Sequence, residues 1–205
     1  MRVLPSGTTA LLVEVDDLDD VLRLYSALEH DRPEGVIDLV PAARTLLVVT
    51  DPAVTSLPSV AQAIRRTPPR EDRLSSGDQL EIPVTYDGHD IAEAAHLLGC
   101  DEAELVRRHT AEQWTVAFCG FVPGFGYLTS RAWQSEVPRR SSPRTKVPPG
   151  SVALAGEFSG VYPRESPGGW QLIGRTELAM FDPSRDPAAL LRPGTLVRFV
   201  EIDRS

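Results

Sequence analysis

The chain has 205 residues, of which 41% are hydrophobic and 24% are charged, a composition typical of soluble globular proteins. No run of residues approaches the roughly 18 apolar positions of a membrane helix, and the N-terminus lacks the small-residue cleavage site of a signal peptide. We therefore expect a cytoplasmic protein without a membrane span. The net charge is −8, and residues 1–90 carry eight arginines against sixteen acidic side chains. Because the remainder is balanced, the charge distribution argues against general nucleic-acid binding.

Residues 1–78 alternate between patterns typical of strands and of helices. An apolar, β-branched run predicts a strand at Thr8–Val15, and apolar residues at helical spacing predict a helix from Leu18 to Leu28. Two more strands and a second helix are predicted at 36–40, 45–50 and 60–66. This order indicates a small α+β sandwich with helices on one face of a sheet. The polar segment 67–78, which contains prolines and a glycine, is the expected linker.

Residues 79–205 are expected to form a second, mostly β domain. A strand at Leu80–Tyr86 precedes two short helices, and the second helix starts with a capping-box pattern of Asp101 and Glu104. From Trp114 onward, short apolar runs alternate with Gly and Pro turns, which is typical of an irregular β-barrel or sandwich. The predicted strands are 115–121, 152–155, 170–173 and 196–202, and one more helix is predicted at 187–191.

Several motifs of well-known catalytic sites are missing. The only lysine is Lys146, and it does not belong to a GxxxxGK phosphate loop. Gly120, Gly124 and Gly126 do not have the spacing of a dinucleotide-binding fingerprint, and no GxSxG elbow occurs. No histidine follows His109, so the C-terminal half cannot supply a Ser–His or Cys–His pair by itself. The cysteines form no metal-binding motif, and we expect no metal site.

A dense glycine–aromatic segment, Phe118–Leu128, reads FCGFVPGFGYL. Glycines allow the backbone to approach a ligand closely, and aromatic rings provide flat apolar walls. Phe121, Gly124 and Phe125 are therefore candidate substrate-binding residues. A tightly bent corner of a barrel uses glycine in the same way, and the segment by itself does not distinguish the two interpretations.

A cationic segment follows at residues 137–150, VPRRSSPRTKVPPG. Its prolines stiffen the loop, and this rigidity reduces the entropy lost when its cations bind an anion. Arg139, Arg140 and Arg144 can each bind a carboxylate or phosphate through two hydrogen bonds, and Lys146 adds a fourth charge. The segment thus predicts a site for a small anion or an acidic partner surface. The alternative is a solvated loop, which composition alone favours.

A third segment, residues 162–176, reads YPRESPGGWQLIGRT. The Ser166 hydroxyl and the amides of Gly168 and Gly169 are potential donors to an anion or oxyanion. Tyr162 and Gln171 are candidates for positioning a substrate. Trp170 fits better as a core residue of the predicted strand.

Together these three segments resemble the hallmark stretches of the family of 5-oxoprolinase B subunits. The family is also called allophanate hydrolase subunit 1, and it includes KipI-like inhibitors of a sporulation histidine kinase. The C-terminal stretch FDPSRDPAALLRPGTLVRFV is similar as well, so the resemblance is nearly continuous over residues 114–202. It implies a small N-terminal α+β domain followed by a cyclophilin-like β-barrel. A cyclophilin-like fold does not imply prolyl isomerase activity.

The resemblance also implies partners. Members pair with a larger homologous protein, which is called the 5-oxoprolinase C subunit or allophanate hydrolase subunit 2. With a separate A subunit they form a bacterial ATP-dependent 5-oxoprolinase, which opens 5-oxoproline to glutamate. ATP is therefore the expected cosubstrate of the complex, and the component that binds it is not assigned. We expect the chain to be inactive alone, because it has no evident nucleophile, metal ligands or nucleotide loop.

Under this interpretation Arg144 and Ser166 are the catalytic candidates, through anion binding and oxyanion stabilisation. The substrate-binding candidates are Phe121, Gly124, Phe125, Arg139, Arg140, Lys146, Tyr162, Gly168, Gly169 and Gln171. Two other functions stay open. One is a KipI-like inhibitor that docks on a sensor histidine kinase, and the other is a carboxyltransferase-type module that acts on urea-derived or allophanate-like substrates.

Overall fold

The computed structural model describes residues 1–68, 70 and 79–203, which form two compact units, Met1–Leu74 and Ser75–Ser205. The expected domain boundary after residue 78, and linker residues 69 and 71–78, lie outside the described residues. Each unit is described by itself below. In the described ranges, none of the helices is both long enough and apolar enough to cross a membrane.

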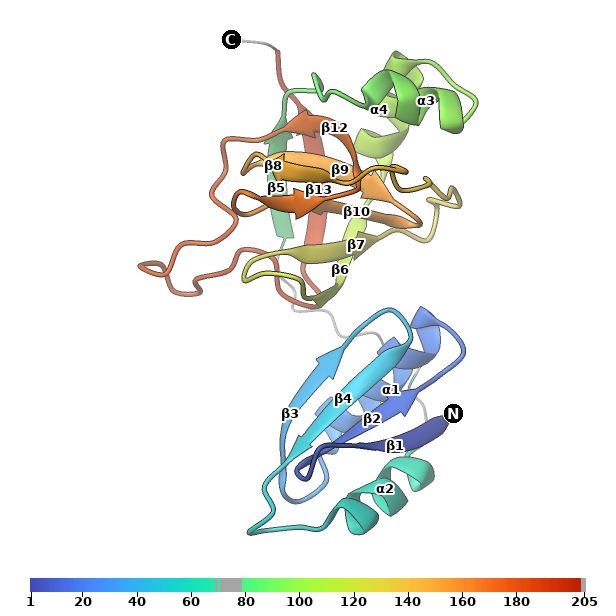
Figure 1. Ribbon diagram of the computed structural model, residues 1–205, viewed down its shortest axis with the longest axis vertical. Helices are drawn as coiled ribbons and strands as arrows, with labels where there is room; N and C mark the ends of the chain where they lie inside the picture. Colours follow the sequence, from blue (N-terminus) through green and yellow to red (C-terminus); the bar gives the residue numbers. More distant parts are fainter. Residues whose placement is uncertain (69, 71–78, 204–205) are drawn as a thin grey trace. The chain divides into compact units, whose positions relative to one another are not determined.

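The first unit is a four-stranded antiparallel sheet with two helices (Figure 1). The sheet order is β1-β2-β4-β3, and Leu11 faces Val48 across the central pair of strands. Leu11 and Val48 belong to one apolar cluster, to which the first helix contributes Leu28 and the second contributes Ile64. The elements are β1 (Arg2–Ser6), β2 (Ala10–Glu14), α1 (Leu18–His30), β3 (Val36–Pro41), β4 (Thr45–Thr50) and α2 (Leu57–Arg66).

The expected small α+β sandwich is confirmed, with two differences at its elements. Strand β1 was not predicted, because its RVLPS sequence contains a proline and its side chains lie largely in solvent at the edge of the sheet. Helix α2 begins three residues earlier than expected. The Ser56 side chain caps the helix by accepting a hydrogen bond from the Ser59 amide. Pro58 lies in the first turn, where the amide that proline lacks would have no helical partner.

The second unit is a seven-stranded sheet in the order β12-β9-β10-β7-β6-β13-β5 that curves until its two edges meet. Thr85 and Arg175 exchange two backbone hydrogen bonds of 2.9 Å, which join the end of β5 to β12. The expected barrel is therefore confirmed (Figure 1). Its elements are β5 (Gln79–Val84), α3 (Ile91–Leu97), α4 (Glu102–Ala111), β6 (Trp114–Cys119), β7 (Gly126–Thr129), β9 (Ser151–Ala155), β10 (Phe158–Val161), β12 (Gln171–Arg175) and β13 (Leu196–Glu201).

A two-stranded ribbon forms a second layer outside the barrel. It pairs β8 (Arg144–Val147) with β11 (Ser166–Gly168). Strand β9 is buried along its whole length because Val152 and Leu154 face the barrel interior, whereas Ala153 and Ala155 belong to a second apolar cluster with Val147 of the ribbon. The short strands β7, β8, β10 and β11 were not predicted, since each has only three or four residues.

The predicted helix at 187–191 is wrong. This segment is irregular, and its Ala189 forms an isolated β-bridge with Phe181. The Leu190 amide also donates to the Met180 carbonyl at 3.0 Å. A five-residue run of good helix formers is too short to overcome the cost of helix nucleation when the backbone has partners of this kind.

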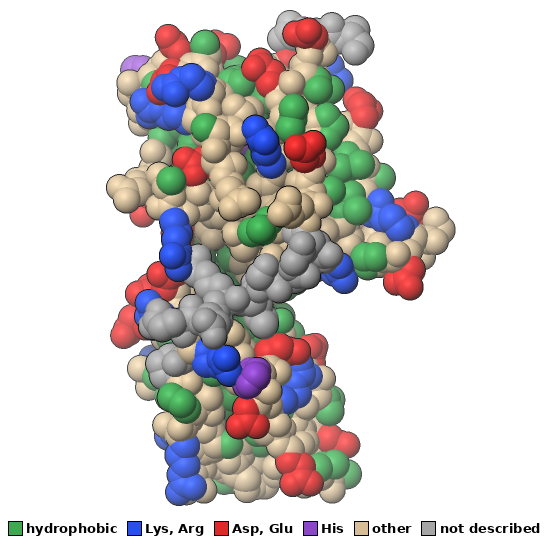
Figure 2. Space-filling view, turned by 180° about the vertical axis from the view of Figure 1, so that it is seen from behind, with side chains coloured by type: hydrophobic (Ala, Val, Ile, Leu, Met, Phe, Trp, Pro, Cys, Tyr) green, Lys and Arg blue, Asp and Glu red, His purple; other side chains and the backbone are tan. Residues whose placement is uncertain are grey.

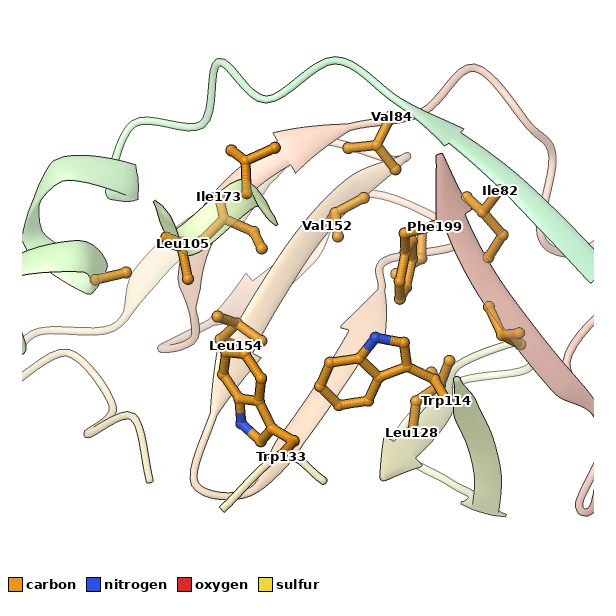
Figure 3. Packing of buried hydrophobic residues seen from close by; sticks show 14 of the residues in the cluster. Ile82, Val84, Leu105, Trp114, Leu128, Trp133, Val152, Leu154, Ile173 and Phe199 are labelled. Atoms are coloured by element: carbon orange, nitrogen blue, oxygen red, sulfur yellow. The ribbon is translucent and has the colours of Figure 1, made fainter. Parts of the chain in front are cut away.

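The barrel interior is filled by large side chains, among them Trp114 and Phe199 from strands β6 and β13 and Trp133 from the connection after β7 (Figure 3). His109 of α4 is fully buried in this core, and its ring stacks on Phe199 with 4.3 Å between centroids. Its Nδ1 lies 2.7 Å from the Tyr86 hydroxyl. His109 therefore contacts both Phe199 and Tyr86 from helix α4.

His109 Nε2 lies 2.8 Å from the Ser159 hydroxyl, so the chain does contain a Ser–His pair, formed with the last histidine itself. Ser159 is fully buried, as His109 is. An enclosed serine is out of reach of a substrate, so this pair stabilises the core. Burial lowers the pKa of His109 from 6.5 to about 3, which keeps the imidazole neutral.

We predict that His109 makes the fold sensitive to mild acid. Below about pH 6.5 the unfolded chain binds a proton at this histidine and the folded chain does not, so the free energy of unfolding should fall by about 1.4 kcal/mol per pH unit. This contribution should continue until the pH approaches 3, the folded pKa. Urea unfolding at about pH 7, 6 and 5 measures it. In His109→Gln the free energy of unfolding should fall less steeply with decreasing pH, by about 1.4 kcal/mol per pH unit. In His96→Gln, at an exposed histidine, its pH dependence should stay unchanged. Equal slopes in wild type and His109→Gln would contradict the assignment.

Candidate functional site

The barrel unit contains a buried carboxylate that binds two arginines of the cationic segment. Asp90 Oδ1 accepts a hydrogen bond from Arg140 Nη1 at 2.7 Å and from Arg144 Nη2 at 2.6 Å. Its other oxygen, Oδ2, accepts from the Leu172 amide at 2.8 Å. The Asp90 side chain is only 3% exposed, whereas the two arginines are about a quarter exposed. One carboxylate thus binds two other segments, each of which lies 50 or more residues from Asp90 in sequence.

Asp90 reaches this position because its loop lies along strand β12. The Gly88 amide donates to the Ile173 carbonyl, and the Asp90 amide donates to the Leu172 carbonyl at 2.9 Å. A Cβ atom on Gly88 would lie 2.3 Å from the Leu172 carbonyl oxygen, so only glycine permits this approach. Asp90 precedes helix α3 in the usual N-cap place, yet its side chain caps no helical amide. The carboxylate faces the arginines instead.

The ribbon β8–β11 and the turn after it place the two arginines. Arg144 pairs with Gly168 across the ribbon, and the Arg140 amide donates to the Gly169 carbonyl at 2.8 Å. A Cβ atom on Gly168 would lie 2.3 Å from the Tyr162 hydroxyl, so the buried tyrosine packs directly beneath this turn. The proline-containing segment is therefore fixed by backbone contacts as well as by Asp90.

The charges at this site keep Asp90 ionised. Burial by itself would raise the pKa of the Asp90 carboxyl. The hydrogen bonds from Arg144 and the Leu172 amide, together with the charges of Arg144 and Arg140, outweigh burial and hold this pKa below its usual range. Glu93 lies 3.6 Å from Arg140 as a second, more exposed carboxylate.

Three buried polar atoms of this network have no hydrogen-bond partner among the described residues: Arg140 Nε, Arg144 Nη1 and Gln171 Oε1. Gln171 is 1% exposed and donates from Nε2 to the Pro138 carbonyl at 3.3 Å, next to the arginine segment. A buried donor or acceptor without a partner costs about 1–3 kcal/mol. Two donors and one acceptor in this state are consistent with a ligand-binding site.

An exposed aromatic side chain contacts Tyr162, the tyrosine that packs beneath Gly168. Phe121 is 55% exposed and has φ of +66°, a left-handed conformation that a non-glycine side chain rarely adopts. Its ring contacts those of Phe125 and Tyr162 edge to face. Strained backbone of this kind concentrates at functional sites, so Phe121 is the strongest candidate of the glycine–aromatic segment.

The structure places the remaining predicted residues as follows. Phe125 and Tyr162 are buried and form the base of the aromatic cluster, and Trp170 is a core residue as expected. Burial raises the pKa of Tyr162, and the positive charge of the exposed Arg139 partly opposes this rise. Gly124 has φ of +83° and packs against Phe181.

Two predicted residues make contacts outside the Asp90 network. Lys146 is 75% exposed and pairs with Glu165 at 3.1 Å. Ser166 is buried, and its hydroxyl donates to the Arg164 carbonyl at 3.0 Å. To stabilise an oxyanion, this hydroxyl would have to rotate away from Arg164. The catalytic role of Ser166 stays a prediction.

Asp90 was not predicted as a site residue. The sequence Gly88-His89-Asp90 before an apolar helix is typical of an ordinary helix start, and it lies about 50 residues before the cationic segment. Two features of the sequence could have indicated Asp90. It follows a glycine by two residues, and the basic segment has only Glu136 as an acidic neighbour in sequence. A charge that is partly buried needs a counter-charge, which comes from another segment when none is near in sequence.

On the face drawn in Figure 2, cationic and anionic side chains are interspersed in small groups. Within the described residues no group of three or more His, Cys, Asp or Glu is arranged to hold a metal ion. The Asp90 network is therefore the best-defined polar site that the structure contains in these ranges.

We predict that Asp90→Ala lowers the free energy of unfolding by roughly 3 kcal/mol, because it leaves two partly buried arginines without their carboxylate. Chemical denaturation measures the loss. The matched control is Asp87→Ala, which breaks the ion pair with the half-exposed Arg175 and should cost less than about 1 kcal/mol. A loss at Asp90 no larger than at Asp87 would show that the network does not hold the segments together.

We predict that Phe121→Gly changes the free energy of unfolding by less than about 1 kcal/mol. Relief of the left-handed backbone, worth about 1 kcal/mol, offsets the lost ring contacts and the added flexibility of the unfolded chain. Phe125→Ala, at a buried ring, should cost about 3–5 kcal/mol in the same denaturation experiment. If both substitutions were equally destabilising, Phe121 would be a core residue and not part of an exposed binding surface.

Comparison with known proteins places the chain in a family. The model of the carboxyltransferase domain, subdomain C and D, matches residues 1–191. The chain is 38% identical over 203 residues to the 5-oxoprolinase B subunit of Escherichia coli O157:H7, covering 95% of this chain and 93% of that protein. It is 36% identical over 219 residues to the 5-oxoprolinase B subunit of Bacillus subtilis strain 168, covering 96% and 90%.

Solved structures agree with this placement. TTHA0988 is 34% identical with a TM-score of 0.76, and the match covers 96% of this chain but only 40% of that longer chain. PH0987 from Pyrococcus horikoshii is 35% identical with a TM-score of 0.58, and the match covers 98% of each chain. Urea carboxylase of Kluyveromyces lactis, at 16% identity and a TM-score of 0.68, shares the fold over 23% of its length. This chain belongs to the 5-oxoprolinase B-subunit family of carboxyltransferase-domain proteins.

Proposed function

We propose that this chain is one component of an ATP-dependent 5-oxoprolinase, which hydrolyses the lactam of 5-oxoproline to glutamate. The observation that carries the proposal is the identity of 35–38% to three proteins named as the B subunit of 5-oxoprolinase, over at least 95% of this chain. The Asp90–Arg140–Arg144 network supports it, because 5-oxoproline is an anion and the network has unpartnered cationic donors.

The chain acts only with partners in this proposal. A larger homologous protein, the 5-oxoprolinase C subunit, completes the site, and the A subunit contributes to the reaction. TTHA0988 supports such an arrangement, since this chain matches 40% of it and the rest of that chain is additional protein. The arginines supply charge without a nucleophile, and the buried Ser159–His109 pair is enclosed in the core. The chemical step therefore needs groups from another chain.

Within the proposed site, Arg144 and Arg140 bind the substrate anion, and Phe121 provides an apolar wall next to Tyr162. Ser166 and the amides of Gly168 and Gly169 are proposed oxyanion donors. Neither the site geometry nor the curated relatives favour a kinase inhibitor or a urea-directed carboxyltransferase over this function.

Reconstitution tests the proposed function. The A and C subunits from the same source are assayed for ATP-dependent release of glutamate from 5-oxoproline, with and without this chain. We predict that turnover requires all three proteins and that the chain alone is inactive. Activity of the A and C subunits without this chain, or of this chain without them, would contradict the proposal.

A further inference from the structure

The unpartnered atoms of the Asp90 network define which chemical groups it can accept. Arg140 Nε and Arg144 Nη1 are donors, and Gln171 Oε1 is an acceptor. Asp90 accepts hydrogen bonds from Nη1 of Arg140 and Nη2 of Arg144, so it fixes each guanidinium group and leaves a buried nitrogen on each without a partner among the described residues. A ligand that satisfies all three atoms needs an anionic acceptor group and a hydrogen-bond donor, either N–H or O–H, close to it.

The charge of the network sets the charge of this ligand. Arg140 and Arg144 pair with the carboxylates of Asp90 and Glu93, so these four charges balance. The adjacent Arg139 then leaves a single positive charge. Lys146 adds nothing further, because Glu165 neutralises it. One excess charge suits a monocarboxylate. A nucleoside triphosphate carries several negative charges, and sites for it use multiple cations or a loop of backbone amides.

Two hydrogen bonds hold together the segments that carry Arg140 and Gln171. Arg140 is anchored to Gly169 by its amide, and Gln171 is anchored to Pro138 by its side chain. These two hydrogen bonds run in opposite directions between segments 138–140 and 169–171. Arg140 and Gln171 therefore belong to the same pair of packed segments, and Arg144 pairs with Gly168 of the adjoining ribbon.

We infer that this network is the receptor for the carboxylate of a lactam-type monocarboxylate, with Gln171 Oε1 accepting the neighbouring amide N–H, and that it is not the nucleotide site of the complex. The inference rests on the proposed function and deepens it, because it assigns one of the two substrates to this chain. Asp90 is a positioning residue in this assignment, since it acts by orienting the two guanidinium groups.

Kinetics of the assembled three-component enzyme test the assignment, with 5-oxoproline and ATP varied separately. Arg144→Gln should raise the KM for 5-oxoproline at least tenfold and change the KM for ATP less than twofold. The inhibition constant of 2-pyrrolidinone, the same ring without a carboxylate, should also change less than twofold. Arg175→Gln, at a half-exposed arginine paired with Asp87, is the matched control and should leave all three constants unchanged.

A binding measurement separates failure of this inference from failure of the proposed function. Calorimetry measures 5-oxoproline binding to the assembled complex without ATP, for wild type, Arg144→Gln and the milder Arg144→Lys, after thermal unfolding has shown that each is folded. Loss of binding in Arg144→Gln with partial retention in Arg144→Lys supports the receptor, even if the complex does not turn over the lactam. An increased KM for ATP with unchanged 5-oxoproline binding would overturn it, as would unchanged constants for both substrates.

Discussion

The site depends on one shared carboxylate. Asp90 accepts from two guanidinium groups on the same oxygen and from a strand amide on the other, so three segments of the barrel unit meet at one buried side chain. A buried anion is tolerated only when it is fully hydrogen-bonded, and the two arginines are tolerated so close together only because the anion lies between them. Each charge therefore requires the others. Removal of any one of these three side chains leaves a desolvated charge without its partner, which lowers the free energy of unfolding.

This mutual dependence explains why the arginines are well placed for a ligand. A guanidinium group on a flexible loop loses much side-chain entropy on binding an anion. In this chain Asp90 and the ribbon β8–β11 have already ordered Arg140 and Arg144, and this ordering is part of folding. The strained backbone of Phe121 at the neighbouring corner is ordered in the same way, through the rings of Phe125 and Tyr162.

Much of the architecture was predictable from local patterns. Alternating and helical periodicities indicated the small sandwich and the barrel, and the cationic segment was recognised from its own composition. Contacts between distant segments were not predictable in this way. Asp90 has the sequence features of a helix N-cap, and only the docking of its loop on β12 shows its partners. The helix predicted at 187–191 failed for the same reason, since its backbone partner, Phe181, lies outside the run.

Strand β9 acts as a spacer between two layers. Its inward residues, Val152 and Leu154, fill the barrel, and its outward residues are the alanines 153 and 155. With side chains this small, the ribbon that carries Arg144 can lie directly on the barrel wall. The reach of a guanidinium group toward a carboxylate is fixed by its side-chain length, so the thickness of this layer sets whether Asp90 and Arg144 can meet. Two methyl groups on the outside of a strand thereby determine the alignment of charges that neither of them contacts.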